Sequence, residues 1–359
     1  MADKSIHILM IGARRTGKSS VLASMINSFK SVAENTNFYL TADTNTSNLI
    51  SEKLIKLHEV FGEHMGEKRF TLDEDPTSEH DTYTFTVSYQ EKKKTQKVAT
   101  LVFHDIVGEK VGSAETAALI KKAGVLLIAV DTVHLMEEGG AFSSVFHKPM
   151  EIKNAIATGG FTDDTKRMEP KMVLFVPLKC EKYYNEGRMR EVVDQINGEK
   201  GFKSLITYLT NENFKERITV AVTPILTMGA LAFDDFGRDE DGKVKRQKIQ
   251  GQANLRPAAV YYKFIGNKFS PKYCEQPVLY ILGFVMASAQ KAREESQTMG
   301  KMIFDLARHV VMFYLFGVIY LGVWSLMKSK KFKEDYTLLA GKLKKSGDGY
   351  KILQNPLYL

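Results

Sequence analysis

The segment from Gly12 to Ser19 constrains the fold of this 359-residue chain more than any other feature. It reads Gly-Ala-Arg-Arg-Thr-Gly-Lys-Ser and matches the phosphate-binding pattern GxxxxGK[ST] without a gap. A short apolar run at 6–11 precedes it, and 20–30 carries apolar residues at helical spacing. A strand, a glycine-rich turn and the start of a helix place backbone N–H groups around a phosphate. The sequence therefore predicts a nucleoside triphosphate site after the first strand.

The residues of this loop have distinct expected roles. Lys18 is expected to contact the outer phosphate oxygens, and the hydroxyl of Ser19 is expected to bind Mg²⁺. The other loop residues that we expect to bind the nucleotide are Gly12, Arg14, Arg15, Thr16, Gly17 and Ser20. Small residues usually occupy the two arginine positions, so this pair is the most specific departure of the loop from the common pattern.

A second motif follows the apolar run 98–104, which reads as a buried strand. The chain continues as Asp-Ile-Val-Gly, in which Asp105 is expected to hold Mg²⁺ through water. Gly108 is expected to offer its backbone N–H to a γ-phosphate, so that hydrolysis moves the segment behind it. An Asp-x-x-Gly turn alone is common, but after a phosphate-binding loop it favours a GTPase.

Strands alternate with helical stretches along the chain, which predicts an α/β fold with a mostly parallel sheet and ligands at its carboxyl edge. The order suggests a Ras-like P-loop GTPase fold, flanked by helices, with insertions and a C-terminal hydrophobic helix. The expected strands cover 82–89, 98–104, 125–131, 172–176 and 218–222, and the expected helices cover 50–61, 113–123 and 142–157. The polar stretch 234–248 is expected to be an exposed loop. The expected division is a P-loop domain at 1–290, a linker and hydrophobic helix at 291–327 and a lysine-rich tail at 328–359.

Composition adds a cellular setting. Apolar content of 44% and charged content of 26% are ordinary for a globular protein. Cys180 and Cys274 lie far apart in sequence, which indicates a reducing compartment rather than a disulfide framework. The N-terminal apolar run is short and contains His7, so no signal peptide is predicted and a cytoplasmic location is expected.

The net charge of +8 is concentrated at the C-terminal end, where 328–359 contributes +5. The remainder is close to neutral, so no nucleic-acid partner is expected. The stretch 310–327 has no charged residue, and as a helix it is about 27 Å long, just short of a hydrocarbon core of about 30 Å. Two interpretations follow: association with the inner, anionic face of the cell membrane, or a helix buried in protein. The lysine-rich tail is likewise either solvated or held on lipid headgroups.

With these motifs the chain resembles the TRAFAC class of GTPases, and within it the bacterial "double-GTPase" proteins of conflict and anti-phage systems. The resemblance covers about 5–290, including 273–282, which would begin the closing helix. It implies a molecular switch that binds GTP or GDP with Mg²⁺ and hydrolyses the β–γ phosphoanhydride, with immunity as its setting.

The resemblance also assigns roles outside the phosphate-binding loop. Glu109 falls where many members place a water-orienting Gln, so the resemblance implies a catalytic role in positioning water, although its carboxylate adds repulsion near a γ-phosphate. The switch threonine, which would bind Mg²⁺ and assist catalysis, is expected at Thr77, with Thr82 as second choice. The guanine-reading segment is Leu-Lys-Cys-Glu at 178–181, where Lys179 would cover the base and Glu181 would accept from the guanine N–H groups.

Arg15 resembles the loop arginine of guanylate-binding and atlastin-type GTPases, which acts as an internal arginine finger when two GTPase domains meet. This implies a homodimer or a protein partner at the GTPase face. The alternative is an arginine that points into solvent or pairs with an acid.

Two functions of the protein remain open: a GTP-hydrolysing switch, and a nucleotide-bound scaffold that does not hydrolyse GTP. A nucleotide kinase ranks third.

Overall fold

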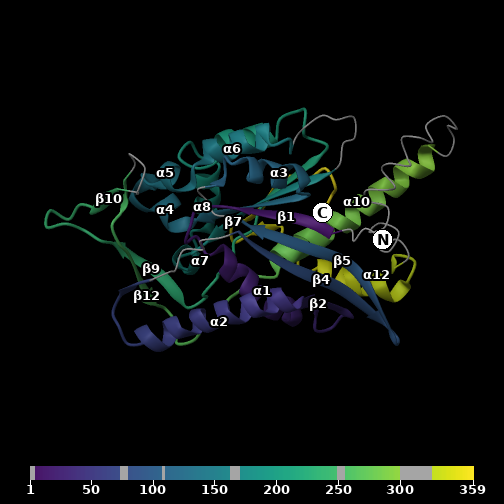
Figure 1. Cartoon of the computed structure of the whole chain (residues 1–359), viewed down its shortest axis with the longest axis horizontal. Helices are drawn as coiled ribbons and strands as arrows, with labels where there is room; N and C mark the ends of the chain where they lie inside the picture. The colour runs from purple at the N-terminus through teal and green to yellow at the C-terminus, as the bar shows by residue number, and fades with distance from the viewer. Residues whose placement is uncertain (1–4, 73–79, 107–109, 162–169, 249–254, 300–325) are drawn as a thin grey trace.

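The chain is described by a computed structural model that covers residues 5–72, 80–106, 110–161, 170–248, 255–299 and 326–359. One nine-stranded sheet runs through the molecule, with helices on both of its faces (Figure 1). In spatial order its strands are β13 (Ser346–Gly347), β14 (Tyr350–Gln354), β8 (Ile218–Val222), β7 (Lys171–Leu178), β6 (Val125–Asp131), β1 (Ser5–Ile11), β5 (Lys94–Asp105), β4 (Asp81–Glu91) and β2 (Phe38–Ala42).

The five central strands β5, β1, β6, β7 and β8 run parallel to one another. Strands β6 and β8 are buried along their whole length, as expected of strands covered on both faces. Antiparallel strands complete both edges, with β4 and β2 beyond β5 and β14 and β13 beyond β8. The expected strands and the mixed α/β class are confirmed, and this order fits a GTPase fold.

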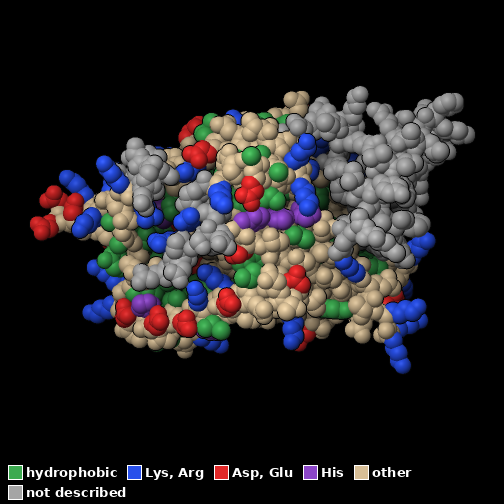
Figure 2. Space-filling model, in the orientation of Figure 1, with side chains coloured by type: hydrophobic (Ala, Val, Ile, Leu, Met, Phe, Trp, Pro, Cys, Tyr) green, Lys and Arg blue, Asp and Glu red, His purple; other side chains and the backbone are tan. Residues whose placement is uncertain are grey.

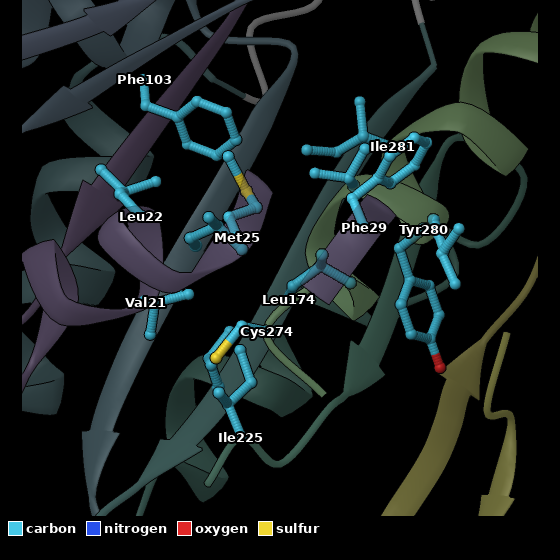
Figure 3. Close-up of a cluster of buried hydrophobic side chains, with 14 of the residues drawn as sticks. Val21, Leu22, Met25, Phe29, Phe103, Leu174, Ile225, Cys274, Tyr280 and Ile281 are labelled. Atoms are coloured by element: carbon cyan, nitrogen blue, oxygen red, sulfur yellow. The ribbon is translucent and has the colours of Figure 1, made fainter. Parts of the chain in front are cut away.

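Helices pack two apolar cores against the sheet. One core combines the sheet with α1 (Lys18–Ala33), α2 (Thr44–His64), α10 (Gln276–Met299) and α12 (Lys330–Ala340). Figure 3 shows Met25 and Phe29 of α1 within this core, beside Phe103 of β5 and Ile281 of α10. The other core includes α3 (Ala114–Lys122), α6 (Pro149–Thr158), α8 (Met189–Ile196) and α9 (Lys203–Leu209). The phosphate-binding loop therefore joins a buried strand to a buried helix, which fixes its position.

A small β lobe is inserted between β8 and α10. Its strands are β9 (Leu231–Phe236), β10 (Arg246–Lys248), β11 (Leu255–Pro257) and β12 (Val260–Phe264). Strands β9 and β12 form a three-stranded sheet with β3 (Phe70–Thr71), and β10 pairs with β11 in a separate hairpin. The lobe lies at one end of the sheet in Figure 1, with the β10 hairpin projecting from it.

Two local expectations were wrong. The helix expected at 142–157 is two helices, α5 (Ser143–His147) and α6, because Lys148 between them is left-handed at φ 52° and Pro149 lacks the N–H that would continue the first. The stretch 234–248 is not one exposed loop, since its first residues belong to β9 and its last form β10. Arg238 between these strands is paired with Asp235 and with Glu138, at 2.9 Å each.

The C-terminal end differs most from expectation. The lysine-rich segment is not a solvated tail, because β14 pairs with β8 inside the main sheet. Asp335 of α12 is fully buried and accepts hydrogen bonds from Asn37 and from the Tyr89 hydroxyl. These polar contacts, together with the tilted ring contact of Phe332 with Phe38 and its edge-on contact with Tyr89, hold α12 against the β2–β4 edge. Residues 330–354 thus contact both edges of the sheet.

Most of the predicted hydrophobic helix at 310–327 lies outside the described residues. Across the described ranges, no helix combines the length and the apolar character that a membrane crossing requires.

Candidate functional site: a phosphate-binding loop at the sheet edge

The phosphate-binding loop runs from β1 to α1 and takes its shape from two glycines. A Cβ atom on Gly12 would lie 2.9 Å from the Cβ of Ala129, so only glycine lets the loop pass this close to β6. Gly17 has φ 97°, a left-handed conformation that favours glycine, and α1 begins at the next residue. The buried Thr16 hydroxyl closes the loop by donating to the carbonyl of Ala13 at 3.0 Å.

The phosphate side of the site, which we define as 12–20 together with Asp105, converges on one carboxylate. Asp105 ends β5 opposite Met10 of β1, which places it beside the loop. The Ser19 hydroxyl donates to Asp105 Oδ2 at 2.7 Å, and Lys18 Nζ lies 3.5 Å from Asp105 Oδ1. Lys18 Nζ also donates to the carbonyls of Gly12 and Ala13, both at 3.2 Å. Two of the three residues expected to bind Mg²⁺, Ser19 and Asp105, are therefore brought together with Lys18, the residue expected to contact the phosphates.

This donor set fits Mg²⁺ bound together with a triphosphate. Mg²⁺ prefers oxygen ligands and is usually held by one or two carboxylates together with substrate phosphates and water, rather than by a complete protein cage. A hydroxyl and a carboxylate 2.7 Å apart, from Ser19 and Asp105, supply that partial set. Within the described ranges, no cluster of three or more His, Cys, Asp or Glu residues suited to a metal occurs.

The two loop arginines differ in position. Arg15 is exposed at the apex of the loop and is left-handed, with φ 63°. Arg14 is half-buried beside it, and Ser20 is buried in the first turn of α1. The Arg15 side chain is therefore accessible to solvent, whereas Arg14 and Ser20 are partly or fully covered by the protein.

Three expected residues lie outside the described part of the chain: Thr77, Gly108 and Glu109. Thr82, the second choice for the switch threonine, is exposed on β4 and pairs across the strands with His104. The roles given to these four residues remain predictions.

The base side of the site, which we define as Lys179, Glu181 and the segment 226–229, begins at the end of β7. Glu181 is 2% exposed, and its Oε1 atom accepts hydrogen bonds from the backbone N–H groups of Met228 at 3.0 Å and Gly229 at 3.2 Å. Burial raises the pKa of Glu181, and these two hydrogen bonds oppose the rise. The carboxylate is therefore already engaged by the protein.

Lys179 is also engaged. It is left-handed at φ 56°, and its Nζ lies 3.4 Å from Asp131 Oδ2 and 5.7 Å from the ring centroid of Tyr262 in the β lobe. Asp131 ends β6, is fully buried, and accepts a hydrogen bond from His134 at 2.8 Å. Burial alone would raise the pKa of Asp131, but His134 and Lys179 outweigh it and hold that pKa well below its usual range.

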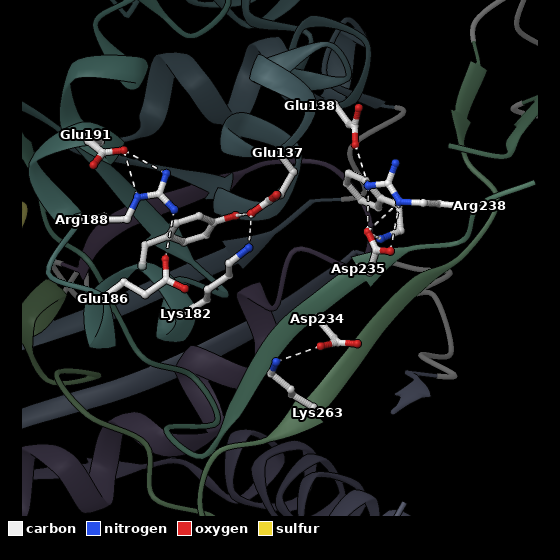
Figure 4. Close-up of polar contacts among 12 residues, drawn as sticks. Glu137, Glu138, Lys182, Glu186, Arg188, Glu191, Asp234, Asp235, Arg238 and Lys263 are labelled. Atoms are coloured by element: carbon white, nitrogen blue, oxygen red, sulfur yellow. Dashed lines mark hydrogen bonds and ion pairs between the residues drawn. The ribbon is translucent and has the colours of Figure 1, made fainter. Parts of the chain in front are cut away.

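Asp131 and the contacts of the β lobe were not predicted from the sequence. The signal for Asp131 was present, since an acid at the end of an uninterrupted apolar strand lies at the carboxyl edge of a parallel sheet. No motif marks the lobe contacts. They include Lys182 over the ring of Phe233 at 5.0 Å and the Arg238–Glu138 ion pair (Figure 4).

Three histidines, of which His104 and His147 are buried and His7 is half-buried, lie near the ends of these strands. His7 and His104 share a hydrogen bond of 2.9 Å beside Asp105, and His147 accepts from the backbone N–H of Asp131 at 2.9 Å. Burial lowers the pKa of each of the three to about 4, so all are neutral at pH 7.

No family model and no curated protein matches the chain. Among solved structures, it is similar to the GTPase-like domain of Ski7 from S. cerevisiae bound to GTP, with a TM-score of 0.34 and 12% identity. The same domain bound to GDP and inorganic phosphate gives a TM-score of 0.30 and 12% identity. Both alignments cover 63% of this chain and 43% of the Ski7 chain, so the chain spans less than half of the structures that it matches.

Proposed function

We propose that this protein is a Mg²⁺-dependent, GTP-binding and GTP-hydrolysing switch of the TRAFAC type. The observation that carries the proposal is the convergence of Lys18, Ser19 and Asp105 at the start of α1. In the proposed complex Lys18 moves from the loop carbonyls to the phosphate oxygens, which carry more negative charge than a carbonyl. Ser19 and Asp105 would hold the metal ion, which would supply positive charge to offset the charge of the phosphates.

Guanine is the proposed base because of the two charged residues that follow β7. A carboxylate at Glu181 is suited to accept from guanine N1 and N2 hydrogens, and Lys179 is suited to cover the ring. A site built for such donors rejects a base that lacks them, because its polar groups are then left unpaired. Leu178 replaces the asparagine of the usual motif, so we expect a preference for GTP rather than strict selection.

For hydrolysis we propose Arg15 as a finger supplied by pairing of two GTPase domains. An arginine that offsets transition-state charge is worth about 10³–10⁵ in rate. Its exposed position in the loop supports this role, because a finger has to be held in place by contact with another surface.

A non-hydrolysing scaffold is the second candidate, favoured by a carboxylate at Glu109 where a glutamine is usual. A role in bacterial defence rests on the resemblance alone.

Turnover measured across protein concentration, with GTP and ATP in parallel, separates these candidates. We expect GTP to be hydrolysed, specific activity to rise with protein concentration, and Arg15→Ala to remove the rise while nucleotide binding is retained. Arg190→Ala, a change on α8 away from the loop, serves as the control. GTP binding without turnover at any concentration would favour the scaffold, and turnover that survives Arg15→Ala would reject the finger.

A further inference from the structure

Asp131, at the end of β6, is a carboxylate that lies entirely inside the protein. Acidic side chains are spread over the face drawn in Figure 2, as is usual for charged residues, whereas Asp131 is 0% exposed. A buried charge is costly unless it is paired and hydrogen-bonded. The partners of Asp131 therefore indicate what the carboxylate does.

The two carboxylate oxygens of Asp131 have different partners. Oδ1 accepts from the backbone N–H of His134 at 3.0 Å and from its ring Nδ1 at 2.8 Å, so this oxygen caps α4 (Thr132–Met136). Oδ2 is buried, accepts no hydrogen bond from the described residues, and faces the ammonium group of Lys179 at 3.4 Å. Helix capping thus accounts for one oxygen only, and the charge facing the other is that of Lys179.

The main sheet fixes this carboxylate beside the base side. Asp131 is the last residue of β6 and pairs in parallel register with Leu178 of β7, the residue before Lys179. Its backbone N–H donates to His147 Nε2 at 2.9 Å, which gives the strand end a second fixed contact. The position of the carboxylate is therefore set by the fold, and the flexible lysine side chain adjusts to it.

The Lys179 side chain is ordered by these contacts. Its backbone is left-handed at φ 56°, its side chain is 14% exposed, and Nζ lies near both Asp131 Oδ2 and the ring of Tyr262. A lysine loses rotamer freedom when it is held against a ligand, which weakens binding. If Asp131 already holds the ammonium group, that loss is made before the ligand binds, and the apolar stem is left to cover a base.

We propose that Asp131 is a positioning residue of the base side, which holds the Lys179 ammonium group so that the lysine stem covers the nucleotide base. This inference rests on the proposed nucleotide function and adds a residue to it. The stem makes apolar contact with a flat ring, which guanine and adenine both present. Asp131 is therefore expected to raise the affinity for GTP and ATP alike, whereas Glu181 is expected to distinguish the two.

Asp131→Asn tests the proposal in the full-length protein, by titration with fluorescent GTP and competition with unlabelled GTP and ATP. The amide keeps an oxygen for the α4 cap but lacks the charge that holds Lys179. We expect both nucleotides to bind about threefold to tenfold more weakly, the scale of ordering one long side chain. The gain in affinity on adding Mg²⁺ should be unchanged. Asp194→Asn, at an exposed position of α8, removes an equal charge and should leave both affinities unchanged.

A double-mutant cycle with Lys179→Met separates positioning from a general structural role. Methionine keeps a flexible apolar chain without the ammonium group, so this variant should lose about as much affinity as Asp131→Asn. If Asp131 acts through Lys179, adding Asp131→Asn to Lys179→Met should cause no further loss. Lys179→Arg keeps a cation facing Asp131 and should recover most of the affinity lost in Lys179→Met. This last comparison leaves Asp131 unchanged, so it applies even if Asp131→Asn does not fold.

Two results would overturn the positioning role: a loss by Asp131→Asn that is equally large in the Lys179→Met background, or equal affinities of Lys179→Met and Lys179→Arg. Wild-type binding that Asp131→Asn leaves unchanged would likewise overturn this inference alone. A wild type that binds no nucleotide would contradict the proposed function and this inference with it. Circular dichroism and urea unfolding establish which variants are folded.

Discussion

The phosphate side and the base side of the site use their polar groups differently. On the phosphate side, the Ser19 hydroxyl and the Lys18 ammonium group both lie against the Asp105 carboxylate. On the base side, Glu181 already accepts two backbone N–H groups, and Lys179 faces a buried carboxylate and an aromatic ring.

This difference arises because the two sides of the site take their hydrogen-bonding and ion-pair partners from different parts of the chain. The phosphate side is built from the β1–α1 loop and the end of the neighbouring strand. The base side depends on the inserted β lobe, whose first residues, Met228 and Gly229, hold the carboxylate of Glu181. Gly229 is left-handed, and a Cβ atom there would lie 1.7 Å from the carbonyl oxygen of Ser270, so the two ends of the lobe pass in close contact. Triphosphate binding is therefore expected to be robust, and base selectivity to depend on the lobe.

The largest expected effect is on the phosphate side. Asp105→Asn keeps the shape of the side chain but removes the charge expected to hold Mg²⁺, so the gain in nucleotide affinity on adding Mg²⁺ should fall at least tenfold. Hydrogen bonds to charged groups contribute about 1.5–3 kcal/mol, which is the scale of such a loss. Fluorescent GTP titrations with and without Mg²⁺ measure the effect. Asp234→Asn, which breaks an exposed ion pair with Lys263 (Figure 4), should leave it unchanged.

A smaller effect is expected on the base side. Glu181→Gln retains an oxygen that can accept from Met228 and Gly229, but it cannot accept from both guanine donors as a carboxylate does. The preference for GTP over ATP should narrow by about tenfold, or about 1.4 kcal/mol, with little change in ATP affinity. Competition titrations with the two nucleotides measure this. An unchanged preference for GTP over ATP would mean that Glu181 only anchors the β lobe. The base side would then differ from the phosphate side in having a structural role alone.

The third expected effect is on the stability of the fold beneath the base side rather than on nucleotide binding. His147 has a pKa of about 4 in the folded protein and about 6.5 when unfolded, so the unfolded chain binds the proton first as the pH falls. Its contribution to stability is complete above about pH 6.5 and declines toward pH 4, by at most about 1.4 kcal/mol per pH unit. His147→Gln keeps an acceptor for Asp131 N–H and should flatten the pH dependence of urea unfolding between pH 6.5 and 4. If the free energy of unfolding falls as steeply with pH in the variant as in the wild type, His147 does not contribute to the pH dependence of stability.

The convergence of Lys18, Ser19 and Asp105 could be predicted from the sequence, although their function stays a prediction. The loop 12–19 and Asp105 lie at the ends of apolar strands whose pairing follows from the alternation of strands and helices. The contacts of Glu181 were not predictable, because its partners are backbone N–H groups of an insertion that carries no motif. The role of 330–354 was missed for a related reason. Lysine is the most frequent residue of this segment, which suggests a solvated tail. The face that α12 buries consists of only three residues at helical spacing, Phe332, Asp335 and Leu339.

The most direct test of the account is calorimetric titration of Mg²⁺·GTP into the wild type, Lys18→Ala and Lys30→Ala. Lys30 is an exposed lysine on the same helix as Lys18. The control variant Lys30→Ala therefore removes an equal charge without changing the loop. We predict that the wild type and Lys30→Ala bind alike, and that Lys18→Ala loses at least tenfold in affinity because the phosphate charge then lacks its main counter-charge. Equal binding by all three proteins would contradict the assignment of Gly12–Ser19 as the phosphate site.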